Sequence, residues 1–235
     1  MKKIFFLVMS ASLLLASCAN NCENAQNVDS KSITASLAVQ SGIKISKTTT
    51  NKKEGKRVLV ISSSPRKGGN TDLLCDEFVK GATEAGGNVE KIFLADYNLD
   101  FLSEQGANQP KEINRDSSEI GRIINKFLDA DVVCLASPTY YMNVNDRMKT
   151  FIDATFLAWG DPKMGNKEYY YITACAQNST ETAEWCINGF RGFVMCTENP
   201  TERGYISAIS MGRPGAVAGT EYMTMAYELG KSINN

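Results

Sequence analysis

From about residue 56 onward, short apolar runs alternate with stretches in which apolar residues recur at helical spacing. Five runs have the length and the β-branched or aromatic content of buried strands: 58–62, 88–94, 131–137, 169–176 and 204–210. Parallel strands need crossovers that place helices over the faces of their sheet. The pattern therefore predicts one α/β domain over residues 56–235, a doubly wound, five-stranded parallel sheet with helices on both faces.

The beginning of the chain does not follow this pattern. Lys2 and Lys3 precede an apolar run, residues 4–15, that is shorter than the roughly 20 apolar residues of a membrane span. This order is typical of a secretory signal, and Leu15-Ala16-Ser17-Cys18 resembles a bacterial lipobox. We expect residues 1–17 to be a lipoprotein signal peptide and Cys18 to be lipidated. An ordinary cleaved signal with a chance cysteine and an uncleaved anchor are the alternatives.

Residues 18–55 are rich in Asn, Ser, Thr and Lys and have no sustained apolar period. This composition is typical of a disordered tether. A flexible coil of this length spans on the order of 35 Å. We therefore expect an exported protein whose lipid anchors it to a bacterial membrane, on the periplasmic or cell-surface face.

The composition narrows the chemistry that the domain can perform. The chain contains no histidine, which excludes Ser-His and Cys-His nucleophilic sites and imidazole metal ligands. No C-x-x-C pair occurs and the cysteines of the domain are scattered, so we expect neither a metal site nor a disulfide. The net charge of -1 gives no electrostatic reason to expect a nucleic-acid partner.

A polar loop follows the first predicted strand and opens directly onto a helix. It runs from Ser62 to Thr71 with the sequence SSSPRKGGNT. Free N–H groups at a helix start, the hydroxyls of Ser64 and Thr71 and the guanidinium of Arg66 would favour an anion with a charge of about -2. The nucleoside-triphosphate loop and the dinucleotide fingerprint are both absent. A plain polar turn with Asn70 as the helix cap is the alternative.

The loop after the third predicted strand, residues 137–145, is unusually aromatic for a surface turn. A flat heteroaromatic ring could lie against Tyr140 or Tyr141 while main-chain amides reach its polar atoms, a combination that is usual in cofactor pockets. Two tyrosines that pack against the sheet edge explain this loop equally well when it is taken alone.

Together the two loops resemble a known family. SSSPRKGGNTDLL and ASPTYYMNVNDRMKTFID are similar to the FMN-phosphate and isoalloxazine loops of the NADPH-dependent FMN reductases and iron-sulfur flavoproteins, which have a flavodoxin-like fold, and the similarity extends over about residues 56–233. The resemblance implies FMN as the cofactor. Its phosphate would be held by Ser62, Ser64, Arg66, Asn70 and Thr71. The flavin ring would be bordered by Pro138, Thr139, Tyr140, Tyr141, Met142 and Asn143, with a further contact from Cys175, Ala176 and Gln177.

The iron-sulfur members of this group carry a close cysteine cluster after their second strand. Residues 96–110 of this chain contain no cysteine. We therefore expect the flavin without the cluster, and no metal.

Flavin chemistry agrees with the missing histidine, because a flavoprotein mainly positions and polarises the ring, and we assign no side chain a catalytic role. We expect an FMN-dependent oxidoreductase, as a homodimer, that passes electrons from an NAD(P)H-like donor to a small acceptor such as a quinone or another flavin. Nicotinamide nucleotides are not expected outside the cytoplasm, so an exported protein could use another donor. The alternatives are an electron carrier that docks redox proteins and a ligand-binding lipoprotein that has lost the flavin.

Overall fold

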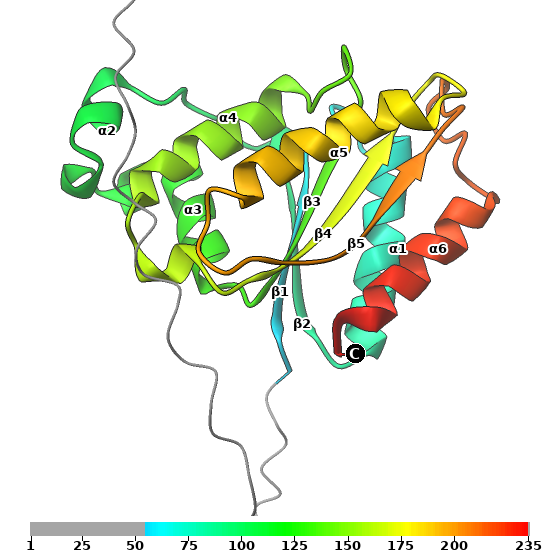
Figure 1. Cartoon of the computed structure of the whole chain (residues 1–235), viewed down its shortest axis with the longest axis horizontal. Helices are drawn as coiled ribbons and strands as arrows, with labels where there is room; N and C mark the ends of the chain where they lie inside the picture. The colour runs from blue at the N-terminus through cyan, green and yellow to red at the C-terminus, as the bar shows by residue number, and fades with distance from the viewer. Residues whose placement is uncertain (1–54, 235) are drawn as a thin grey trace, which may run out of the picture. The chain divides into compact units, whose positions relative to one another are not determined.

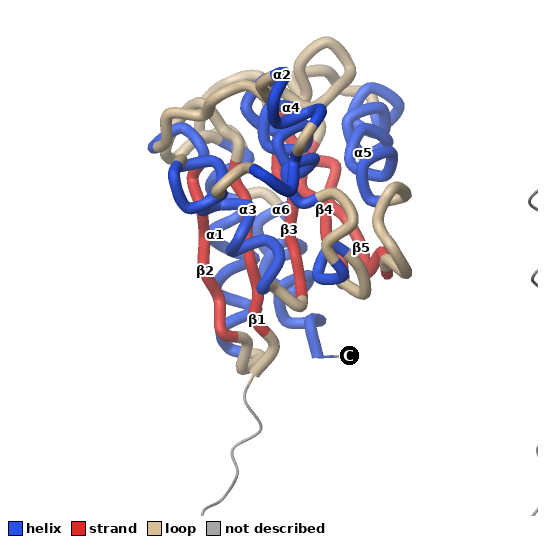
Figure 2. Tube along the Cα trace, turned by 90° about the vertical axis from the view of Figure 1, so that its left-hand side faces the viewer, coloured by secondary structure: helices blue, strands red, loops and turns tan. Residues whose placement is uncertain are grey.

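The computed structural model describes residues 55–234, and the predicted signal peptide, the lipidation site at Cys18 and the tether as far as Glu54 lie outside them. The described chain forms one five-stranded sheet whose order is β2-β1-β3-β4-β5 (Figure 2). All neighbouring strands are parallel. The strands are β1 (Arg57–Ser62), β2 (Asn88–Phe93), β3 (Val132–Pro138), β4 (Glu168–Ala174) and β5 (Thr201–Ala208). This is the flavodoxin-like strand order, so the predicted fold class is confirmed.

Helices cover both faces of the sheet (Figure 1). One face carries α1 (Asn70–Glu84) and α6 (Glu221–Lys231). The other face carries α3 (Glu119–Asp129), α4 (Asp146–Ala154) and α5 (Thr180–Val194), and the short α2 (Glu104–Asn108) lies in the connection between β2 and α3. Within residues 55–234, no helix has the length and the apolar content that a bilayer crossing requires.

The strands separate two hydrophobic cores because their side chains alternate between the faces. Tyr169 and Tyr171 of β4 belong to the core beneath α3, α4 and α5. Tyr170, between them, belongs to the core beneath α1 and α6. All three side chains are fully buried, as is usual for a central strand of a parallel sheet with both faces covered.

The helices α1 and α6 cross closely because glycines lie at their contact. A Cβ atom on Gly81 would collide with the backbone carbonyl of Tyr227, and one on Gly230 would collide with that of Phe78. The crossing holds α6 against α1, and the loop that connects β5 to α6 borders the site described below.

The prediction for β5 was wrong at its start. The strand begins at Thr201, three residues before the predicted Gly204. Its first residues are exposed and polar because β5 is an edge strand, so no apolar run marks them in the sequence.

Candidate functional site

The carboxyl ends of β1 and β3 lie beside each other where the direction of winding reverses, which is the usual place for a ligand in such a sheet. Two cavities open at this edge. The smaller, of about 220 Å³, is bordered by the loop after β1, the end of β3 and residues 211–214. The larger, of about 480 Å³, is bordered by the loops after β3 and β4 and by α5. Thr139 and Ala176 line both cavities, so the two are neighbours.

The smaller cavity lies against the first turn of α1. Gly69 is the N-cap of this helix, and no side chain caps the first N–H groups. Asp72 instead reaches backward, and its Oδ2 accepts from the backbone N of Gly68 at 3.0 Å. The helix start therefore keeps unsatisfied N–H groups and a positive dipole end, which suit an anion.

The carboxylate of Asp72 is almost fully buried, at 5% exposure. It forms an ion pair with Lys91, with 2.6 Å between Nζ and Oδ1. Ser62 Oγ donates to the same Oδ1 at 3.1 Å. The negative charge is thus compensated inside the protein, and the loop beside it is held in place.

Hydrogen bonds also fix the loops after β1 and β3 to each other. Asn145, which is 2% exposed, donates from Nδ2 to the backbone carbonyl of Ser63 at 2.7 Å. Its Oδ1 accepts from the backbone N of Met148 and so caps α4. Ser63 Oγ donates to the carbonyl of Ala136 on β3 at 2.9 Å. The two loops therefore form one preorganised wall.

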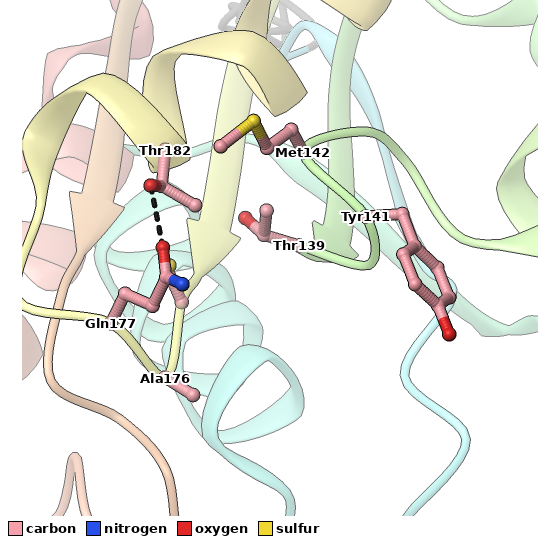
Figure 3. Close-up of a pocket in the computed structure, with 7 residues that line it drawn as sticks. Thr139, Tyr141, Met142, Ala176, Gln177 and Thr182 are labelled. Carbon is pink, nitrogen blue, oxygen red and sulfur yellow. Dashed lines mark hydrogen bonds between the residues drawn. The ribbon is translucent and has the colours of Figure 1, made fainter.

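A tight two-residue turn stands at the rim of the larger cavity. Tyr140 and Asn143 exchange two backbone hydrogen bonds of 3.0 Å. The central residues, Tyr141 and Met142, have φ angles of 49° and 58°, a region that residues other than glycine rarely adopt. The side chain of Tyr141 is completely exposed and points away from the residues across the cavity (Figure 3). Such strain persists only where the surrounding structure imposes it, and it is often found at functional sites.

The wall opposite this turn comes from the segment after β4 and from α5. Gln177 Oε1 accepts from Thr182 Oγ1 at 2.8 Å (Figure 3). Thr139, which lines the cavity, shares a hydrogen bond of 2.8 Å between hydroxyls with Thr173. Most of the remaining lining is apolar, from Met142 and Ala176 among others, as in pockets that bury a planar ring.

Within residues 55–234 the two cavities lack an acidic side chain, and the cysteine that lines the larger one, Cys175, is buried. Burial raises the pKa of Cys186, which is close to Thr139 and Thr173, to about 11. Burial likewise raises the pKa of Cys75 to about 12. The same part of the chain contains no cluster of three or more potential metal ligands.

The structure places most of the predicted site residues around these cavities. Those that line the smaller cavity are Ser64, Arg66, Asn70, Thr71, Pro138, Thr139 and Tyr140. Those that line the larger cavity are Thr139, Tyr141, Met142, Cys175, Ala176 and Gln177.

Ser62 and Asn143 line neither cavity. The hydroxyl of Ser62 lies in the core and donates to Asp72. Asn143 Oδ1 accepts from the backbone N of Val144 at 2.8 Å, so Asn143 shapes the turn. The predicted side-chain contact from Ser62 to a phosphate is not available in this geometry, because β1 directs this residue toward α1.

The sequence interpretation missed residues of two segments. Met211, Gly212, Arg213 and Pro214 complete the smaller cavity, and Thr182 completes the larger one. The loop after the fifth strand could have been included from the sequence, because every loop that follows a strand of a parallel sheet lies at the carboxyl edge, where the ligand binds.

Comparison with known proteins places this geometry in a family. The model of the NADPH-dependent FMN reductase family matches residues 56–199, more than half of the chain. An iron-sulfur flavoprotein of Archaeoglobus fulgidus is 36% identical over 96 residues, which are 40% of this chain and 42% of that protein. YwqN of Bacillus subtilis, described provisionally as an NAD(P)H-dependent FMN-containing oxidoreductase, is 29% identical over 133 residues, which are 52% of this chain and 68% of that protein. The chain thus spans less than half of the first relative and about two thirds of the second.

Solved structures show the same fold. The azoreductase of Bacillus anthracis str. Sterne aligns with a TM-score of 0.59 and 16% identity, over 75% of this chain and 97% of that one. An FMN-dependent NADH-azoreductase of Bacillus anthracis str. Ames Ancestor in complex with FMN aligns with a TM-score of 0.56 and 14% identity, over 75% and 96%. The extent of the family match and the loop geometry lead to one conclusion: the chain belongs to the NADPH-dependent FMN reductase family.

Proposed function

We propose that this protein is an FMN-dependent oxidoreductase that takes two electrons from NAD(P)H or a similar donor and passes them to a small planar acceptor such as a quinone or a flavin. One observation carries the proposal. In a member of this family, an uncapped helix start and a largely apolar cavity lie next to each other at the switch point of the sheet.

The smaller cavity fits the phosphate end of FMN. The open N–H groups of α1 and the exposed guanidinium of Arg66 supply donors for a phosphate monoester. Thr71, whose side chain also lines this cavity, adds a hydroxyl. No dinucleotide fingerprint is present, which supports FMN over FAD.

The larger cavity fits the flavin ring and a neighbouring acceptor. Bound FMN would supply the two-electron redox chemistry, and the chain would position the ring and exclude water from one side of it. Gln177, held by Thr182, offers an amide to the polar edge of the ring. The absence of acidic side chains from the lining, within the described residues, favours weakly polar acceptors over cationic ones.

An electron carrier is the second candidate. The complete exposure of Tyr141 at the cavity rim is the observation that favours it, because exposed aromatic side chains are frequent in protein contacts. A carrier would exchange electrons with a docked protein and react slowly with small molecules.

Two further parts of the proposal rest on the sequence. We place the protein on the outer side of a bacterial membrane through a lipid on Cys18, supported by the lipobox-like Leu15-Ala16-Ser17-Cys18. We also propose a homodimer, on the basis of the family resemblance. Sedimentation of the purified protein measures its oligomeric state.

Stopped-flow reoxidation tests the function. The FMN-loaded protein is reduced chemically without oxygen and mixed with a quinone. We expect reoxidation faster than that of free reduced FMN, and Tyr141→Ala should change this rate more than it changes FMN affinity, because the phosphate contacts dominate binding. A rate no faster than that of free reduced FMN would contradict the oxidoreductase and leave the carrier.

A further inference from the structure

We propose that the loop between β5 and α6, residues 209–220, forms the second half of the phosphate site, and that Arg213 binds the same phosphate monoester as Arg66. This inference rests on the proposed function, because it takes the phosphate of FMN as the ligand of the smaller cavity. It concerns a segment that lies beyond residues 56–199, the part that matches the family model.

Arg66 and Arg213 differ from the other arginines of residues 55–234. Both are exposed, and both line the smaller cavity. Every other arginine in that part of the chain forms an ion pair with a carboxylate or donates to a backbone carbonyl. Neither of these two guanidinium groups has such a partner within the described residues. Two uncompensated cations at one cavity favour a dianion, and a phosphate monoester carries a charge of about -1.5 to -2 at neutral pH.

Asn70 holds the loop against the start of α1. Its Nδ2 donates to the backbone carbonyls of Met211, at 2.9 Å, and Arg213, at 2.8 Å. Its Oδ1 accepts from the backbone N of Val217 at 3.2 Å. Both amide hydrogens are therefore used by the loop, and the side chain of Asn70 cannot also donate to a phosphate. The side chain of Asn70 is thus a positioning group, so a direct contact of Asn70 with the phosphate would have to come from its backbone N–H at the start of α1.

The loop sequence restricts its own backbone around Arg213. Pro214 follows directly and has a fixed φ. Gly215 has a φ of 74°, a value that glycine adopts without strain. Together with the three bonds to Asn70, these residues preorganise the loop, so that little conformational freedom is lost when Arg213 binds an anion.

The test compares the affinities of FMN and riboflavin, which differ by the phosphate alone. Dissociation constants are measured by flavin fluorescence for the wild-type full chain and for Arg213→Ala, Arg66→Ala and Arg122→Ala. Loss of a charge-assisted contact should weaken FMN binding by about ten- to a hundredfold in the first two variants and leave riboflavin binding nearly unchanged. Arg122 is exposed on α3 and lines neither cavity, so its variant is the matched control. Arg213→Gln, which keeps a long polar side chain, should show the same loss as Arg213→Ala.

The variant Asn70→Ala tests the positioning role. It should reduce the preference for FMN over riboflavin in the same direction as Arg213→Ala, because the released loop no longer presents Arg213. Equal weakening of both ligands by Asn70→Ala would contradict this role, since it would mean a general loss of structure.

An unchanged preference for FMN over riboflavin in both Arg213 variants would overturn the inference while FMN remains the cofactor. If the same variants also showed a reduced preference for NADPH over NADH in turnover, Arg213 would be assigned to the 2′-phosphate of the donor instead. A wild-type chain that binds FMN and riboflavin equally would instead contradict the proposed function.

Discussion

The strained turn at the cavity rim predicts that replacing Tyr141 by asparagine stabilises the protein. Positive φ costs a residue other than glycine about 1 to 2 kcal/mol, and asparagine tolerates this region much better. The side chain of Tyr141 is fully exposed, so its removal loses no packing that would offset the gain. We expect Tyr141→Asn to raise the free energy of unfolding by about 1 kcal/mol, and the melting temperature by about 2 to 4 °C for a domain of this size.

Chemical denaturation measures this change, and Tyr140→Asn is the matched control. Tyr140 is one residue away and 43% exposed, but its φ is not positive, so asparagine has no strain to relieve there. We expect the control to be no more stable than the wild type. The reasoning would be refuted if Tyr141→Asn were as stable as the wild type or less stable. If the strain serves electron transfer, Tyr141→Asn should also slow quinone reoxidation.

Three other changes have outcomes that the structure or the sequence determines. Burial lowers the pKa of Lys167 from 10.5 to about 8, so between these pH values the unfolded chain binds more protons than the folded one. In denaturation at several pH values, the stability of the wild type relative to Lys167→Met should therefore rise by up to about 3 kcal/mol from pH 8 to pH 10.5. A stability difference that stays constant over this range would contradict the pKa shift. Asn145→Ser keeps a capping oxygen but leaves the carbonyl of Ser63 without its buried donor, which should cost about 1 to 3 kcal/mol in the same assay; no loss would show that the two loops are held by other contacts. Cys18→Ala should move the protein out of the membrane fraction or leave it unprocessed, and mass spectrometry of a wild-type terminus without lipid would contradict the anchor.

The architecture and the position of the site could be predicted because the pattern of a buried parallel sheet is local. The apolar run before Ser62 and the glycine-rich segment after it identify a strand, a loop and a helix start. The alternation of strands and helices along the chain predicts a parallel sheet, in which the carboxyl ends of all the strands lie at one edge. The family resemblance added the identity of the ligand. None of these inferences needs a contact between distant residues.

The residues that sequence reasoning misplaced depend on long-range contacts. Asn70 was predicted as a ligand, but its amide is used by carbonyls more than 140 residues away. Arg213 was overlooked because its loop has no hydrophobic period and follows an edge strand with a weak pattern. Ser62 is the exception, because the alternation of side chains along β1 places it on the α1 face with Val58 and Val60, and this local pattern was available in the sequence.

The central claim is that the two cavities together hold FMN, and titration of the purified protein with FMN and riboflavin tests it most directly. Calorimetry gives both the stoichiometry and the dissociation constants. We predict one FMN per chain, with riboflavin bound at least about tenfold more weakly because it lacks the phosphate that α1 and the arginines bind. Equal affinity for the two flavins, or no saturable binding of FMN, would contradict the account.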